Sequence, residues 1–198
     1  MRRSVMAMLF LAALATAACS GSDMGPSSSN LRILLTDAPI DLTGVTAVNV
    51  TIDEVTLYPG DESAGDEGGV PVDGGPISAP GGFTANLLDF RNGNVTLLTS
   101  DAIPAGTYQR IRLHVSSAEL ARDDDGDPAT PDLIEPIFIP SGKVDVPVPF
   151  TLSVSETLEV TLDFDAEASV QVNSTGGQHE YILRPVITPA GTRAGSPI

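Results

Sequence analysis

Apolar and polar residues alternate with a period of two along most of the chain after residue 30. The alternation is clearest in the segments 31–35, 48–52, 111–115, 158–164 and 181–187. A period of two places successive side chains on opposite faces of a β-strand, whereas a helix repeats about every 3.6 residues. Because each strand then has one apolar and one polar face, the pattern predicts antiparallel sheets that bury one face and expose the other.

Breaks in the alternation predict finer features of two strands. The phase shifts at Asp53-Glu54 and resumes with Val55, which predicts a β-bulge. Pro147 and Pro149 cannot donate a hydrogen bond to a β-ladder. The segment 144–149 is therefore predicted to be an edge strand.

Turn residues separate the strands. Asn92-Gly93 is the dipeptide most typical of a hairpin turn, and Gly176-Gly177 is expected to open a last hairpin. The segments 104–106 and 140–142 each combine Pro and Gly, as tight turns do. With roughly eight to ten short strands and no amphipathic helix between them, the predicted fold class is all-β, an antiparallel β-sandwich such as an immunoglobulin-like one.

The N-terminal residues have the layout of a secretory signal. A basic start precedes an apolar run over 5–15, and the small residues that follow end at Cys19, the only cysteine. This arrangement resembles a bacterial lipoprotein signal, in which residues 1–18 are removed and the cysteine becomes a lipidated N-terminus. Thr16 departs from the aliphatic residue that is usual in such signals. Ordinary secretion with cleavage near Ala17, or an uncleaved anchor, are the alternatives.

The rest of the chain divides by composition. Residues 19–30 are rich in Gly and Ser and form a tether, residues 31–190 carry the strand pattern, and residues 191–198 are expected to be a C-terminal tail. Acyl chains on Cys19 would hold the protein on a lipid bilayer of the cell envelope. Ser20 directly after the cysteine permits sorting to the outer membrane, with the domain on its periplasmic or its surface face.

Composition and charge exclude several classes of protein. The chain of 198 residues has a formal net charge of −16 and contains one cysteine and two histidines. A single cysteine excludes an internal disulfide and a Cys/His zinc cage. Nucleic acid repels an acidic surface and is excluded as a partner. The acids concentrate in an insert at 59–82 and in a segment at 122–132, which we interpret as long loops.

The second of these loops contains the densest acidic motif. Asp123, Asp125 and Asp127 alternate as oxygen ligands do in calcium loops. The match to an EF-hand is incomplete, because Pro128 stands where that loop requires Gly. A calcium site at these three aspartates is one interpretation, and a solvated hairpin loop without metal is the other. No other cofactor is expected.

No arrangement of residues predicts an enzyme, and no catalytic residue is assigned. Asp163 and Asp165 lie on one face of their predicted strand, where paired carboxylates could transfer protons. Pairing across strands with Arg110, Arg112 or Arg184 is the simpler interpretation of these acids.

Three other polar residues receive structural interpretations. Asp37 precedes Ala38-Pro39 and is expected to cap its own turn. His114 lies on the polar face of its predicted strand and His179 lies at a turn, and their spacing does not support a shared metal site.

The order of short motifs along the chain resembles a known family. The motifs are Leu35–Pro39, Leu87–Asp89, Ile103–Tyr108, Pro140–Gly142, Asp163–Ala166 and Tyr181–Val186. This order is similar to domain of unknown function 4382, a family of bacterial and archaeal envelope lipoproteins, over residues 31–187. The resemblance implies a prealbumin-like or related β-sandwich and no established activity.

Anchor, tether and strand pattern together predict the role of the protein. We expect a membrane-anchored bacterial lipoprotein whose β-sandwich is a binding or structural module, with an envelope protein or a polysaccharide as its partner. The alternative is a calcium-dependent adhesion or glycan-binding domain that uses the Asp-rich loops.

Overall fold

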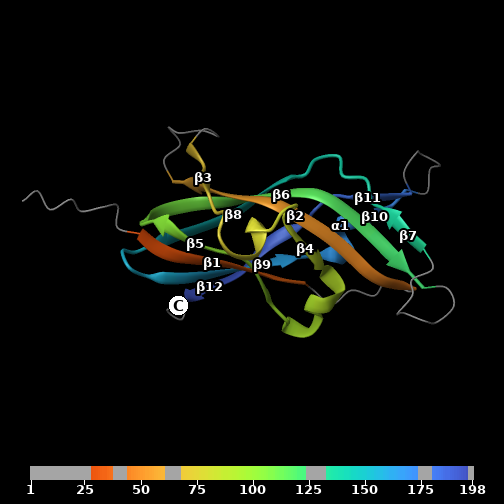
Figure 1. Ribbon diagram of the computed structural model, residues 1–198, viewed down its shortest axis with the longest axis horizontal. Coiled ribbons are helices and arrows are strands. Elements are labelled where there is room, and N and C mark those ends of the chain that lie inside the picture. Colours follow the sequence, from red (N-terminus) through yellow and green to blue (C-terminus); the bar gives the residue numbers. More distant parts are fainter. Residues whose placement is uncertain (1–27, 38–43, 61–67, 124–132, 174–179, 196–198) are drawn as a thin grey trace, which may run out of the picture.

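Two main β-sheets pack face to face in the computed structural model (Figure 1). The structure describes residues 28–37, 44–60, 68–123, 133–173 and 180–195. The first sheet has the order β12 (Ile187–Ala194), β9 (Thr157–Phe164), β1 (Ser28–Thr36) and β5 (Thr96–Pro104). The predicted all-β sandwich is confirmed for the described part of the chain.

The second sheet is built around two long strands, β2 (Val45–Pro59) and β6 (Gly106–Arg122). The outer edge of β2 pairs with β3 (Val70–Pro71) and β4 (Phe83–Asn86). The outer edge of β6 pairs with β7 (Leu133–Pro136) and β8 (Lys143–Leu152). Smaller elements complete the fold: β10 (Val170–Val172), β11 (Tyr181–Leu183), α1 (Ala166–Ser169) and the 3-10 helices η2 (Gly75–Ser78) and η3 (Leu87–Gly93).

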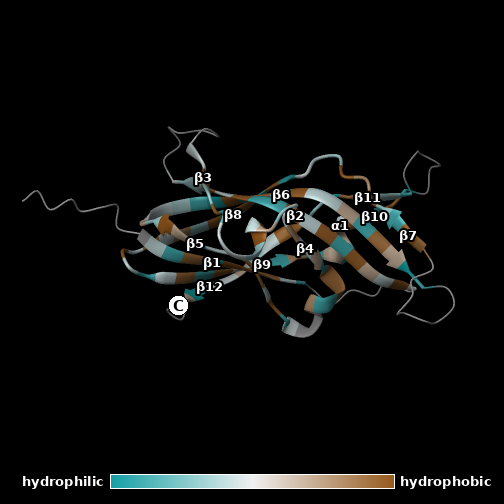
Figure 2. Ribbon diagram, in the orientation of Figure 1, coloured by the Kyte–Doolittle hydropathy of each residue, from teal (hydrophilic) through white to brown (hydrophobic). Residues whose placement is uncertain are grey.

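The hydrophobic core lies between the two main sheets. Buried residues alternate with less buried ones along β6, β8 and β9, and Figure 2 shows bands of hydrophobic and hydrophilic residues along the strands. Ile33 of β1, Leu57 of β2 and Leu113 of β6 are fully buried, and Phe164 of β9 is the largest side chain without exposed surface. The period-two pattern therefore assigned the buried faces of these strands correctly.

One strand pair departs from the antiparallel prediction. β1 runs parallel to β9, in a register that joins Asn30 to Thr157 and Thr36 to Asp163. A parallel pair needs a long connection rather than a hairpin, and here most of the domain lies between the two strands. Nothing in the local sequence of β1 or β9 indicates that these two strands pair with each other.

The predicted bulge at Asp53 is confirmed. Ile52 pairs with Val115 and Glu54 with His114, so Asp53 is an extra residue in β2. On the other side of the same point, Thr51 pairs with Ser117, so Ser116 is an extra residue in β6. Each bulge changes which residues of its strand face outward.

The predicted edge strand is also confirmed. Within the described residues, β8 pairs with β6 alone, and Pro147 stands opposite Arg110 in this ladder. The two prolines of β8 suit a strand that has one unpaired edge.

The hairpin predicted at Asn92-Gly93 is wrong. Gly93 has a φ of 78° but ends η3, which connects β4 in one sheet to β5 in the other. The dipeptide does adopt a turn-like backbone, but its flanking strands pair with different partners. A local turn signal cannot specify which sheet each flanking strand joins.

The acidic insert at 59–82 is only partly a loop. Its described second half contains β3 and η2, and it buries Val72 and Ile77 in the core. Gly82 closes the insert with a φ of 87°, and a Cβ there would lie 2.4 Å from the carbonyl oxygen of Ile52. The insert is therefore anchored to the sandwich by apolar contacts and by a position that requires glycine.

The turn at 104–106 carries the chain from the first sheet to the second. The hydroxyl of Tyr108 donates a hydrogen bond of 2.8 Å to the carbonyl oxygen of Pro104, and its ring stacks on Phe150 at 5.4 Å. Burial raises the pKa of the Tyr108 hydroxyl above its ordinary value. This tyrosine fixes the corner where β5 leads into β6.

The sandwich extends beyond the boundaries expected from sequence. β1 begins at Ser28, within the expected tether, and β12 continues to Ala194, within the expected tail. Arg193 binds Glu159 through two nitrogens, at 2.7 Å for each contact. The last strand is thus part of the folded domain.

Candidate functional site

The predicted lipidation and calcium residues fall mostly outside the described part of the chain. Cys19, Asp125 and Asp127 lie outside it. Asp123 follows the end of β6, and its backbone N–H donates a hydrogen bond of 3.1 Å to the carbonyl oxygen of Gly44. The calcium site therefore stays a prediction.

Asp163 and Asp165 do not form the carboxylate pair that their spacing suggested. Asp163 is in β9, whereas Asp165 follows the strand and caps α1, where its side chain accepts a hydrogen bond of 2.8 Å from the N–H of Ala168. Arg112, one of the arginines predicted as a cross-strand partner of these acids, binds Asp145 through two nitrogens. The strand ends at Phe164, between the two acids, so the Asp165 carboxylate is engaged in the helix cap, whereas Asp163 belongs to the β-ladder.

Asp37 joins two distant parts of the chain. Its side chain is buried, and Oδ1 accepts a hydrogen bond of 3.0 Å from the N–H of Ala166. The turn that Asp37 was expected to cap continues into residues 38–43, which lie outside the described residues. Asp37 thus fastens the end of β1 to the start of α1.

Two bulges divide the outer face of the second sheet into two halves. Before the bulge at Ser116, β6 directs Arg110, Arg112 and His114 outward; after it, Ser117 and Glu119 face outward. The bulge at Asp53 shifts β2 in the same way. The face therefore has a charged half and a half that carries mainly uncharged polar groups.

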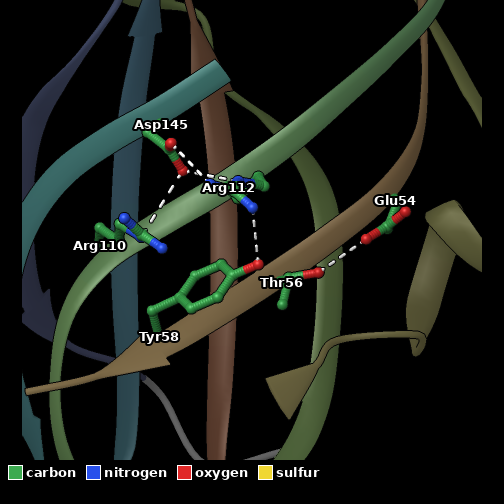
Figure 3. Close-up of polar contacts among 6 residues, drawn as sticks. All are labelled: Glu54, Thr56, Tyr58, Arg110, Arg112 and Asp145. Atoms are coloured by element: carbon green, nitrogen blue, oxygen red, sulfur yellow. Dashed lines mark hydrogen bonds and ion pairs between the residues drawn. The ribbon is translucent and has the colours of Figure 1, made fainter. Parts of the chain in front are cut away.

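The charged half is organised around Tyr58, as Figure 3 shows. The Tyr58 ring is buried beneath two guanidinium groups, with Arg110 at 4.1 Å and Arg112 at 4.9 Å from the ring centroid. Arg112 also binds both carboxylate oxygens of Asp145, at 2.8 and 2.9 Å, and donates to the Tyr58 hydroxyl at 2.9 Å. Such a fork on a carboxylate fixes the guanidinium in one plane.

The other charged contacts beside this cluster are local pairs. Nδ1 of His114 lies 2.6 Å from Oδ1 of Asp53, the residue of the bulge. The Thr56 hydroxyl donates to Glu54 at 3.0 Å. His179, the second histidine of the chain, lies outside the described residues. Because Arg110 and Arg112 both pair with Asp145, at 3.7 and 2.8 Å, and both cover the Tyr58 ring, we interpret the cluster as a structural element of the sheet face.

Replacing Arg112 with lysine tests this interpretation. A lysine keeps the charge but loses the two-point contact with Asp145 and the flat contact with Tyr58. We expect the free energy of unfolding to fall by about 1 kcal/mol, since Asp145 is partly exposed and its ion pair is screened. Urea denaturation measures this change. Lys143→Gln, on the exposed neighbouring strand, should change it by less than about 0.5 kcal/mol, and an equal loss in both variants would contradict the role of the guanidinium.

The polar half contains a groove of about 440 Å³. Its walls come from four strands and include Asn49 and Thr51 of β2, Thr84 of β4, Ser117 and Glu119 of β6, and Ile134 and Pro136 of β7. A second depression of about 370 Å³ shares Ser117 and Pro136 with the first and adds Phe138. The two depressions adjoin across β6 and β7.

The amino-acid sequence carries no motif at these groove residues. Serines, threonines and an asparagine on the polar face of strands are common, and none stands in a motif. The ladders that join β4, β2, β6 and β7 bring them together.

Two further findings concern the described segments as a whole. None of their helices has the length and apolar character that a bilayer span requires. No three His, Cys, Asp or Glu side chains within them come together as a metal site would need.

The two packed sheets define the chain as a β-sandwich protein. Residues 28–185, most of the chain, match the family model described as domain of unknown function (DUF4382). The chain belongs to this family, which confirms the family inferred from the order of its motifs. None of the curated proteins and none of the solved structures matches it.

Proposed function

We propose that this protein is a bacterial lipoprotein, anchored to an envelope membrane through acyl chains on Cys19, whose β-sandwich is a non-catalytic binding or structural module. The observation that carries the proposal is the N-terminal sequence, in which a basic start, a short apolar run and small residues lead directly to the only cysteine. Two or more acyl chains on one terminus are enough for stable anchoring.

The position of β1 supports this proposal. Eight residues separate Cys19 from Ser28, where β1 begins, and they can span at most about 30 Å. Ser28 pairs with Pro104, next to the start of β6, so the tether joins the sandwich at that end. β6 then extends for about 50 Å to its other end at Arg122. An anchored domain would keep the Ser28 end near the bilayer and present the other end to the surroundings.

The site geometry favours a non-catalytic role. The best candidate for acid/base chemistry was the pair of Asp163 and Asp165, and the carboxylate of Asp165 is used to cap α1. On the sheet face, Arg110 and Arg112 both pair with Asp145, at 3.7 and 2.8 Å. These groups are engaged in holding the fold.

Substitution of Cys19 by alanine tests the anchor. In a bacterial host, the parent protein is expected in the membrane fraction, and mass spectrometry should find an N-terminal peptide that begins with acylated Cys19. The Cys19→Ala variant should lose the acyl group and leave the membrane fraction. Ser20→Ala is the control, because it leaves the cysteine in place. Membrane association of Cys19→Ala equal to that of the parent would overturn the proposal.

A further inference from the structure

We propose that the groove formed by β4, β2, β6 and β7 binds a neutral oligosaccharide. This inference deepens the binding role proposed above and rests on that role, although it does not require the lipid anchor. The groove volume of about 440 Å³ is within the range of small-ligand sites. The polar and apolar groups of its walls indicate which class of ligand it binds.

The polar wall offers both acceptors and donors of hydrogen bonds. Asn49 donates through Nδ2 to Oε1 of Glu119 at 3.0 Å, which holds both side chains in place. Oδ1 of Asn49 and Oε2 of Glu119 then have no partner among the described residues, and they can accept from two hydroxyl groups. Two neighbouring hydroxyl groups of a sugar could donate to this pair of atoms, because both the amide oxygen and the carboxylate oxygen are acceptors.

Hydroxyl groups complete this wall. The Oγ1 atoms of Thr51 and Thr84 are 2.9 Å apart, so they share one hydrogen and leave the other free to donate. The Ser117 hydroxyl is exposed beside them and can both donate and accept. Sugar hydroxyls also donate and accept hydrogen bonds. The wall offers an acceptor for each hydroxyl that donates and a donor for each hydroxyl that accepts.

The opposite wall is apolar. Ile134, which lines the groove, is 58% exposed, and Phe138, which lines the adjoining depression, is 42% exposed; Pro136 borders both. These exposed apolar groups beside polar ones give a ligand an apolar surface to pack on. The C–H face of a sugar ring can pack on such a wall while its hydroxyls contact the polar side.

Other classes of ligand fit less well. An anionic ligand would meet the Glu119 carboxylate and no lysine or arginine in the groove walls. A divalent cation needs several oxygen ligands with more charge than one carboxylate supplies. A peptide that adds a strand needs an open sheet edge, whereas this groove lies on the face of strands that pair with one another.

The location suits a ligand outside the membrane. Ser117 is eleven residues along β6 from Gly106, or about 36 Å. Gly106 is at the end of the sandwich where the tether joins. The groove is therefore on the half of the domain away from the proposed anchor.

Titration of the full-length protein in detergent tests the inference. The probes are hexasaccharides of β-1,4-glucose, α-1,4-glucose, β-1,3-glucose and β-1,4-N-acetylglucosamine, with a galacturonic acid oligomer and a mixture of extended pentapeptides as contrasts. Binding is measured by calorimetry and by saturation-transfer NMR. We expect at least one neutral sugar to bind. Glu119→Gln and Asn49→Ala should each weaken that binding about tenfold, the effect of one charge-assisted or paired hydrogen bond.

Matched controls separate binding from folding. Glu167→Gln and Gln171→Ala change exposed residues outside the groove and should leave the dissociation constant unchanged. The thermal melting temperatures of all four variants should stay close to that of the parent. Absence of binding to every neutral sugar, binding only to the acidic oligomer or the peptides, or sugar binding that neither groove variant weakens would each overturn the proposal. These results do not involve Cys19, so failure here is distinguishable from failure of the anchor.

Discussion

Replacing Phe164 with alanine is expected to lower the free energy of unfolding by about 3–5 kcal/mol, the largest effect of any single change considered. Phe164 is the largest side chain without exposed surface, and it lies at the end of β9, opposite Ile187 of β12. Its removal loses the transfer free energy of the ring and leaves a cavity that the flanking strands cannot close. Urea denaturation followed by circular dichroism measures the change.

Val154→Ala is the control for this prediction. Val154 lies in the turn between β8 and β9 and is 59% exposed. Its truncation should change the free energy of unfolding by less than about 0.5 kcal/mol. A loss below about 1 kcal/mol in Phe164→Ala would show that the ring is not part of a tightly packed core.

Replacing Glu159 with alanine is expected to have the second largest effect, a loss of about 2–3 kcal/mol. The Glu159 side chain is 6% exposed although it faces outward, because Arg32 and Arg193 cover it. Arg32 binds Oε1 at 2.5 Å, and Arg193 binds Oε2 at 2.7 Å. Removing the carboxylate loses charge-assisted hydrogen bonds on both sides and leaves Arg32, which is 27% exposed, without its acceptor.

Glu159 also fastens the last strand to the sheet. Arg193 comes from β12 and Arg32 from β1, on opposite sides of β9. Hydrogen exchange should therefore show faster exchange in β12 of the Glu159→Ala variant. Glu167→Ala removes an exposed carboxylate and is the comparison for the loss of charge alone. Equal free energies of unfolding in the two variants would mean that the contacts of Glu159 with Arg32 and Arg193 stabilise the fold no more than a surface charge does.

The strand faces and the main bulge were predictable because they depend on neighbours in sequence. Burial of one face requires apolar residues at every second position, and an extra residue must shift this phase. Asp53 shows the rule, since the phase of β2 changes at this residue and the register confirms it. Pro149 in β8 shows a second local rule, in which a missing N–H limits the strand to an edge.

The hairpin at Asn92-Gly93 and the acid pair were not predictable in the same way. Gly93 has the positive φ that a hairpin turn would use, but β4 and β5 belong to different sheets. Asp163 and Asp165 have the spacing of one strand face, but the strand ends between them. At Gly93 the turn-like backbone was predictable but the partner strands were not, and at Asp165 the end of the strand was missed.

The groove could not have been found from the sequence. Asn49, Thr84, Glu119 and Ile134 come from four strands, and each is an ordinary residue for the polar or exposed side of a sheet. Their proximity follows from the ladders between β4, β2, β6 and β7, which place Asn49 opposite Glu119, 70 positions away in the sequence.

The sequence by itself determined which face of each long strand is buried, where β2 bulges, and which strand must lie at an edge. It also carries the signal that predicts an anchor at Cys19. Only the tertiary structure decided that β1 pairs in parallel with β9, that Glu159 is held by two arginines, and that a polar groove crosses the second sheet. The physical reason is that the hydrophobic periodicity of a strand depends on which of its side chains face the core and which face solvent. The choice of partner strand depends on packing between whole sheets. That packing is made by residues far apart in sequence, so the pattern along one strand does not show it.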